Sequence, residues 1–185
     1  MKNKKILVGV TGGIAAYKTC SLVNMLLKEG ADVKVIMTHG ATNFVTPMTF
    51  QSLTNHQVYL DMWKTYNKEE VEHISLAQWA DLVIISPATA NIIGKIAHGI
   101  ADNLLTTVVM ATPKETPVLI ASAMNTNMWE NPIVQKNVES LREDKKYSFT
   151  GTREGVLACR DEGAGKIADN EDILKKAKEI LAKRK

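Results

Sequence analysis

The sequence predicts a doubly wound α/β fold, in which one parallel sheet carries helices on both faces. Short apolar runs at residues 6–10, 33–37 and 82–85 are rich in β-branched side chains and too short to be buried helices. A glycine turn and a helical pattern separate the first two runs, which makes a βαβ unit. Because such a unit implies parallel strands and a right-handed crossover, we expect a parallel sheet of five or six strands.

The first half of the chain is predicted to begin strand, turn, helix, strand. The first helical pattern is closed by Gly30, a typical residue after a helix C-terminus. In order, the expected elements are a strand (6–10), a glycine turn (11–13), a helix (14–29), a strand (33–37), two short helices broken near Pro47 (41–55) and a polar loop (59–70).

The second half is predicted to alternate helices with strands and to end in a charged helix. Pro132 suits the first turn of a helix, and the pair Ser86-Pro87 is expected to stop the strand before it. The expected elements are helices at 73–80, 92–97, 101–111, 132–142 and 172–185, strands at 82–85, 118–121 and 147–149, and a glycine-rich stretch at 151–165.

Size and composition indicate an ordinary soluble enzyme-sized domain, spanning residues 1–185. The chain has 185 residues, 45% hydrophobic and 23% charged, with a formal net charge of +3. Aromatic residues are few and no nucleic-acid motif is visible, so nucleic-acid binding is not expected. No run approaches the ~20 apolar residues of a membrane span. No pair of histidines or cysteines has metal-ligand spacing, so no metal is expected.

The cysteines and the N-terminus favour a cytoplasmic protein. Residues 1–5 are basic, like the start of a signal peptide, but the apolar run 6–10 is too short for its core. The two cysteines lie far apart, which favours free thiols in a reducing compartment.

The loop after the central strand is the first candidate site. Ligands of open parallel sheets bind at the carboxyl ends of the strands, and here residues 82–85 lead into Ser86, Thr89 and Asn91. Asn125 closes the strand 118–121 in the same way. Its amide suits a carboxylate or the edge of a flavin ring, although it could equally cap the turn.

The glycine turn after the first strand suggests a second part of that site. Backbone amides at a helix N-terminus attract phosphate, and Gly12 and Gly13 precede a helical pattern. The dinucleotide motif G-x-G-x-x-G is absent, and the second strand ends in Thr38, where an acidic ribose ligand would be expected. A mononucleotide or flavin phosphate is therefore favoured over NAD. The alternative is a turn without a ligand.

Two further side chains are candidates for chemistry. His73 begins a predicted helix on its apolar face, where histidine is often a core residue; the helix N-terminus, however, disfavours imidazolium and suits a base. Cys159 lies in a glycine-rich stretch beside Arg160, which favours the thiolate. Cys20, within the first helix, is interpreted as a small buried residue.

Five motifs in register resemble those of a known family. They are G-V-T-G-G-I-A-A-Y-K (9–18), H-I-S-L-A-Q-W-A-D (73–81), P-A-T-A-N-I (87–92), A-M-N-T-N-M-W (123–129) and A-C-R-D-E-G-A-G-K (158–166). Together they resemble the homo-oligomeric flavin-containing cysteine decarboxylases, and within them the branch that acts on phosphopantothenoylcysteine in coenzyme A biosynthesis. The resemblance runs from about Lys5 to Asp169 and implies a Rossmann-like or flavodoxin-like fold with FMN as cofactor.

The resemblance also implies roles for individual residues. His73 and Cys159 match the catalytic histidine and cysteine, and Asn125 matches the residue that holds the substrate carboxylate. Val156, Ala158 and Ile167 match positions of the flap that covers the substrate. The implied cofactor contacts are Gly12, Gly13 and Ile14 at the phosphate, Thr38 and His39 nearby, and Thr89, Ala90, Asn91, Ile92 and Ala123 around the rest of FMN.

The chemistry implied by the resemblance passes through a thioaldehyde. Decarboxylation of a cysteine carboxyl leaves a carbanion without an electron sink, so the flavin first oxidises the C–S bond. The resulting thioaldehyde accepts the electrons as an enethiolate, and reduction, with a proton from Cys159, then gives the aminothiol. Ser122 and Ile92 depart from the usual Pro and Thr or Ser, and each departure weakens a flavin-loop contact slightly.

The family usually forms trimers or larger homo-oligomers with FMN at a subunit interface. Its bacterial members are usually fused to a synthetase domain, so a synthetase partner on a separate polypeptide is expected here. Three alternatives stay open. They are an oxidative decarboxylase of a C-terminal peptidyl-cysteine, a related flavin-binding prenyltransferase, and a non-catalytic regulatory subunit.

Overall fold

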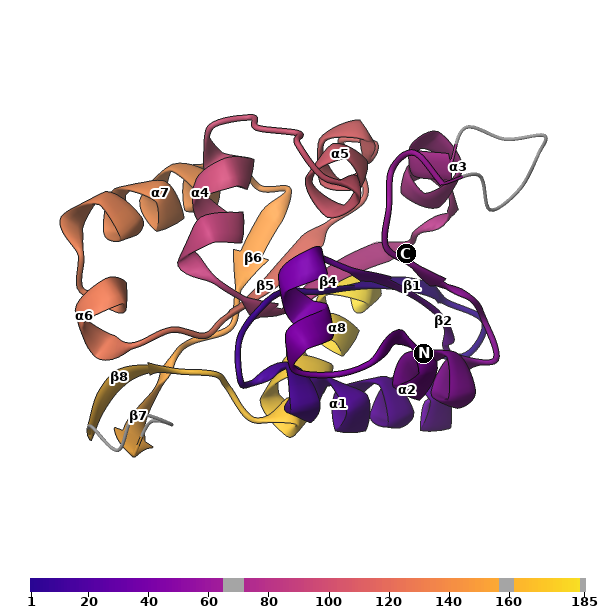
Figure 1. Cartoon of the computed structure of the whole chain (residues 1–185), viewed down its shortest axis with the longest axis horizontal. Helices are drawn as coiled ribbons and strands as arrows, with labels where there is room; N and C mark the ends of the chain where they lie inside the picture. The colour runs from indigo at the N-terminus through magenta and orange to yellow at the C-terminus, as the bar shows by residue number, and fades with distance from the viewer. Residues whose placement is uncertain (65–71, 157–161, 184–185) are drawn as a thin grey trace.

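Six parallel strands form one sheet at the centre of the protein (Figure 1). The structure is a computed structural model, and it describes residues 1–64, 72–156 and 162–183. The strand order is β3-β2-β1-β4-β5-β6, the order of a doubly wound nucleotide-binding fold. The strands are β1 (Lys5–Val10), β2 (Asp32–Met37), β3 (Val58–Tyr59), β4 (Leu82–Ala88), β5 (Val118–Ser122) and β6 (Tyr147–Phe149).

Helices cover both faces of this sheet, which confirms the predicted fold class. One face is covered by α1 (Ala16–Lys28), α2 (Pro47–Thr54) and α8 (Asn170–Ala182). The other is covered by α3 (Glu72–Trp79), α4 (Ala90–Ala97), α5 (Leu104–Ala111) and α7 (Pro132–Glu143) (Figure 1). The remaining described elements are η1 (His39–Asn43), α6 (Thr126–Trp129), β7 (Arg153–Val156) and β8 (Glu162–Lys166).

The alternation of side chains along each strand produces two cores. In β1, Ile6 and Val8 belong to the core under α1, α2 and α8, whereas Leu7 belongs to the core under the other helices. The central strands have no solvent-facing side, which explains their continuous apolar runs. Each fully buried aliphatic side chain contributes about 1.5–3 kcal/mol to folding.

Most predicted elements are present, and the differences are local. β4 does not stop at Ser86-Pro87 but continues to Ala88, with a register shift against β5 between Ile85 and Ala88. The polar loop was expected to begin at residue 59, but Tyr59 is the second residue of β3. α5 begins at Leu104 rather than at residue 101, because Asn103 caps it.

Besides β3, the helix α6 and the strands β7 and β8 were not predicted. α6 is a single helical turn, and β7 pairs with β8 as an antiparallel hairpin within the glycine-rich stretch. α6 has 4 residues, too few to show a helical period, and β7 and β8 (R-E-G-V and E-G-A-G-K) have glycine and charged residues where a predictable strand has apolar ones. Among the described residues, every helix is too short or too polar to cross a membrane.

Candidate active site

A cavity of about 1060 Å³ opens at the carboxyl ends of β1, β2, β4 and β5. Its walls come from the segments that follow these strands, namely residues 11–18, 38–40, 89–95 and 123–128, with further residues at 102–103 and 165–167. β1 and β4 are neighbours, and from them the chain winds outwards in opposite directions. The cavity therefore lies at the topological switch point, where ligands of open α/β sheets bind.

The structure gathers most of the predicted site residues in this wall. All ten predicted cofactor contacts line the cavity: Gly12, Gly13, Ile14, Thr38, His39, Thr89, Ala90, Asn91, Ile92 and Ala123. Asn125 and Ile167 line it too. Residues far apart in the sequence thus meet because four parallel strands end at the same edge of the sheet.

The other predicted residues are placed differently. His73, in the first turn of α3, is half-buried and is not among the described residues that line the cavity. Val156 ends β7, and its side chain is not described. Ala158 and Cys159 lie outside the described residues. The resemblance implied that His73 is the catalytic histidine, and the structure does not bring its side chain into the cavity of the same chain.

The glycine turn brings the backbone of two loops together. A Cβ atom on Gly12 would lie 2.8 Å from the carbonyl carbon of Gly40, so a side chain there would collide with backbone. Gly12 is therefore required by the close approach of the loops rather than by its backbone angle. The same turn leads into α1, whose N-cap is Ala15 and has no capping side chain. The Ala16 and Lys18 amides already donate to Gly13 O at 2.9 Å and Ala15 O at 3.0 Å, so an anionic group would lie at the turn 12–14 before the helix rather than at these two amides.

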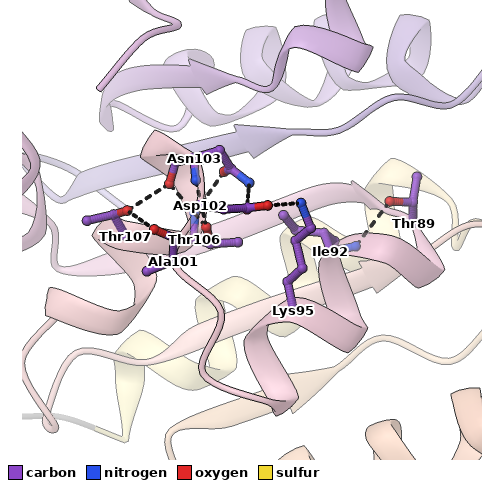
Figure 2. Close-up of polar contacts among 8 residues, drawn as sticks. All are labelled: Thr89, Ile92, Lys95, Ala101, Asp102, Asn103, Thr106 and Thr107. Carbon is purple, nitrogen blue, oxygen red and sulfur yellow. Dashed lines mark hydrogen bonds and ion pairs between the residues drawn. The ribbon is translucent and has the colours of Figure 1, made fainter. Parts of the chain in front are cut away.

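The loop after β4 is shaped by Thr89. Its Oγ1 accepts a hydrogen bond from the Ile92 amide at 3.4 Å and caps α4, as Figure 2 shows. Threonine at the N-cap position explains why α4 begins at Ala90, two residues before the predicted start. The cap also holds Thr89, Ala90, Asn91 and Ile92 as one short turn in the cavity wall.

A charged group in the wall, at the last turn of α4, was not predicted. Lys95 Nζ donates to Asp102 Oδ2 at 2.6 Å, and Asn103 Nδ2 donates to Asp102 Oδ1 at 2.9 Å (Figure 2). Asn103 Oδ1 also accepts from the Thr106 amide at 3.1 Å and forms a capping box at the start of α5. The hydrogen bond from Lys95 lowers the pKa of the Asp102 carboxyl. The N-cap pattern of Asn103 and Thr106 is a sequence signal for the start of α5, but it does not indicate the pairing of Lys95 with Asp102.

The charges in the wall favour an anionic ligand. Among the described lining residues, three are lysines (Lys18, Lys95 and Lys166) and one is an aspartate (Asp102). Asp102 is paired with Lys95, which leaves a net positive wall. Within the described part of the chain, no cluster of three His, Cys, Asp or Glu side chains has the arrangement of a metal site.

Asn125 combines a structural bond with its place in the wall. Its Oδ1 accepts from the Asn127 amide at 2.9 Å and caps α6. The capping role that the sequence left open is therefore present. α6 follows directly after Asn125, and its Met128 side chain lines the cavity and is also exposed to solvent.

Comparisons with known proteins assign the chain to a family. The model of the Flavoprotein family matches residues 1–182. The chain is 47% identical over 182 residues to the coenzyme A biosynthesis bifunctional protein CoaBC of Bacillus subtilis, covering 98% of this chain but only 44% of that relative. It is 44% identical to a probable phosphopantothenoylcysteine decarboxylase of Streptococcus mutans, covering 96% of this chain and 99% of that protein.

Solved structures agree with this assignment. A PPC decarboxylase variant complexed with pantothenoylaminoethenethiol has a TM-score of 0.87 and 32% identity, with 98% of this chain and 100% of that chain covered. The FMN binding protein AtHal3 has a TM-score of 0.81 and 33% identity, with 96% of each chain covered. By sequence and fold, the chain belongs to the Flavoprotein family.

Proposed function

We propose that the protein decarboxylates 4'-phosphopantothenoylcysteine to 4'-phosphopantetheine in coenzyme A biosynthesis, with FMN as cofactor. The observation that carries the proposal is the cavity at the switch point, which gathers all ten predicted cofactor contacts with Asn125 and Ile167. The likeness to decarboxylases over almost the whole chain supports the same reaction rather than that of the peptidyl-cysteine decarboxylases.

The described residues fit a flavin mononucleotide. The phosphate would lie at Gly12, Gly13 and Ile14, which line the cavity at the positive N-terminal end of α1. The cavity volume of about 1060 Å³ lies just above the usual range for ligand and cofactor sites, about 300–1,000 Å³, and so offers room for both cofactor and substrate. FMN supplies an oxidant for the cysteine C–S bond and a reductant for the later step. The protein has to bind, orient and exclude water.

Substrate binding is assigned to the rim of this cavity. We propose that the Asn125 amide holds the substrate carboxylate and that Ile167, Val156 and Ala158 cover the substrate. Ile167 is buried and lines the cavity. The proposed proton donor for the final saturated carbon is Cys159.

His73 is the proposed base, supplied by a second copy of the chain. It does not line the described cavity of its own chain, so a site that includes it needs a neighbouring copy. Three apolar side chains in the wall are also exposed: Ile14 at 56%, Tyr17 at 58% and Met128 at 48%. Burying them would stabilise an interface beside the cavity. We therefore propose a homo-oligomer, a homotrimer in its simplest form, with FMN at the subunit interface.

The wider assignment follows from the reaction. Residues 1–185 are proposed to act as one flavoprotein domain in the cytoplasm, where the thiol substrate stays reduced. The chain spans less than half of the bifunctional relative, at 44% of its length. A phosphopantothenoylcysteine synthetase is therefore the proposed partner in the pathway.

The test is the mass of the product after anaerobic incubation with phosphopantothenoylcysteine. Loss of carbon dioxide alone is expected, because the flavin is reoxidised within the cycle. Loss of carbon dioxide and two hydrogens would instead indicate an enethiol product, as in the peptide-modifying branch. Unchanged substrate in the presence of bound FMN would overturn the proposal.

A further inference from the structure

The irregular end of β4 is held by two threonine side chains. β4 pairs regularly with β1 up to Ile85 and Gly9, and its register against β5 shifts between Ile85 and Ala88. Ser86 and Pro87 lie in this irregular part. Their carbonyl oxygens accept from the hydroxyls of Thr19 at 2.7 Å and Thr11 at 2.6 Å. Both threonines are buried, with exposed fractions of 0% and 2%.

Thr11 makes a second bond that Thr19 does not make. The Thr89 amide donates to Thr11 Oγ1 at 3.2 Å, and the Oγ1 atoms of Thr11 and Thr89 lie 3.4 Å apart. One hydroxyl of the loop after β1 thus holds both Pro87 and Thr89 of the loop after β4. Thr89 in turn caps α4 through the Ile92 amide (Figure 2).

The loop after β1 is proposed to bind the phosphate of FMN, and the loop after β4 is proposed to bind the rest of the cofactor. The first carries Gly12 and Gly13, and the second carries Thr89, Ala90 and Asn91. Resting on the proposed FMN function, we propose that Thr11 is a positioning residue that fixes the second loop for cofactor binding. The hydroxyl of Thr11 donates to Pro87 O and accepts from Thr89 N, and valine of the same shape can do neither.

The test is the affinity for FMN, measured by quenching of flavin fluorescence on titration with apoprotein. Thr11→Val is expected to weaken FMN binding about 10- to 100-fold, because the buried Pro87 carbonyl and the half-buried Thr89 amide both lose their partner. Thr11→Ser keeps the hydroxyl and is expected to bind within about threefold of the wild type. Thr112→Val is the matched control, because Thr112 Oγ1 donates to Val108 O at the same 2.6 Å but lies away from the cavity.

A double mutant separates positioning from direct contact. If Thr11 acts through the second loop, Thr11→Val combined with Thr89→Val weakens FMN binding by less than the product of the two single effects. If the double mutant instead weakens FMN binding by the full product of the two single-mutant factors, the two residues act independently, and the inference is overturned. Thermal unfolding of each apoprotein shows that the variants are folded.

The outcomes also separate this inference from the proposed function. Wild-type affinity for FMN in Thr11→Val would overturn the positioning role alone. An equal loss in Thr11→Val and Thr112→Val would also overturn it, because the effect would then be general loosening. Absence of FMN binding by the wild-type protein would overturn the proposed function and this inference with it.

Discussion

Lys95 Nζ lies 2.6 Å from Asp102 Oδ2, and the two side chains join α4 to the loop before α5 in the cavity wall. Asp102 also accepts from Asn103, the residue that caps α5 (Figure 2). Helices α4 and α5 are therefore connected through one carboxylate at the side of the cavity. Because the side chain of Asp102 is 51% exposed, the pair serves geometry more than stability.

This pair predicts a pH dependence with a definite sign. The hydrogen bond that Lys95 donates lowers the pKa of the Asp102 carboxyl below the ordinary value of about 3.9. The contribution of the ionised Asp102 carboxylate to the free energy of unfolding is therefore fully present above about pH 4. It is lost as the pH falls through the pKa of Asp102 in the folded protein, which is lower than in the unfolded chain. Urea unfolding from about pH 2 to pH 7 measures it. Asp102→Asn should be slightly less stable than wild type at neutral pH and equal to it in acid, and Lys95→Met should show the same convergence. Parallel curves would contradict this.

Gly12 predicts a steric effect on the cofactor loop. In Gly12→Ala, the new Cβ would lie 2.8 Å from the Gly40 carbonyl carbon, so one loop has to move. We expect a loss of about 1–3 kcal/mol in the free energy of unfolding, together with weaker FMN binding. Gly151→Ala is the control, since nothing lies within 4 Å of the Cβ position there. Equal behaviour of the two variants in urea unfolding and FMN titration would refute the steric argument.

The main fold could be predicted because its signals are local. The runs at 6–10, 33–37, 82–85 and 118–121 each appear as a strand, since a strand covered on both faces needs apolar side chains at every position. β3 could not be predicted from Val58 and Tyr59 alone, because two residues show no period. It forms only because β2 offers a free edge for pairing.

Site residues that closely follow a strand could be predicted from the sequence. Site residues that meet only through tertiary contacts could not. Thr89 and Asn125 follow strands, and both line the cavity. Lys95 and Asp102 are seven residues apart on either side of a helix end, and only the turn at Gly99, with its φ of +67°, brings them together. The place of His73 relative to the cavity depends on where α3 packs against the sheet, in the same core as α5, which spacing in the sequence does not contain.

Lys146 predicts a second pH effect, on the alkaline side. Its Nζ donates to the carbonyl oxygens of Val109 at 3.2 Å and Thr112 at 2.8 Å, at the end of α5. Burial lowers the pKa of this lysine from its ordinary value of about 10.4. Between the folded and unfolded pKa the unfolded chain binds more protons, so stability rises with pH in that window. Relative to Lys146→Met, the wild type should gain stability in urea as pH rises towards about 10.4. A constant difference would contradict the shift.

A shared active site predicts complementation between two inactive variants. His73→Asn should lack the base and Asn125→Asp should repel the substrate carboxylate, so each homo-oligomer alone should be inactive. If His73 of one copy serves the cavity of another, a mixed oligomer contains some sites with both groups intact. Random one-to-one mixing gives about a quarter of the sites this composition, because each of the two positions is wild type half the time.

Decarboxylation by the co-expressed pair, purified through a tag on each chain, measures this recovery. The control pairs two copies of His73→Asn with different tags, which should stay inactive. Purification through both tags removes unmixed oligomers, and each mixed homotrimer then has one intact site in three, so recovery near a third of the wild-type rate would support a site built from two copies. If the mixed oligomer forms but stays as inactive as its parents, His73 and Asn125 must act within one chain, and the proposed interface position of the site is wrong.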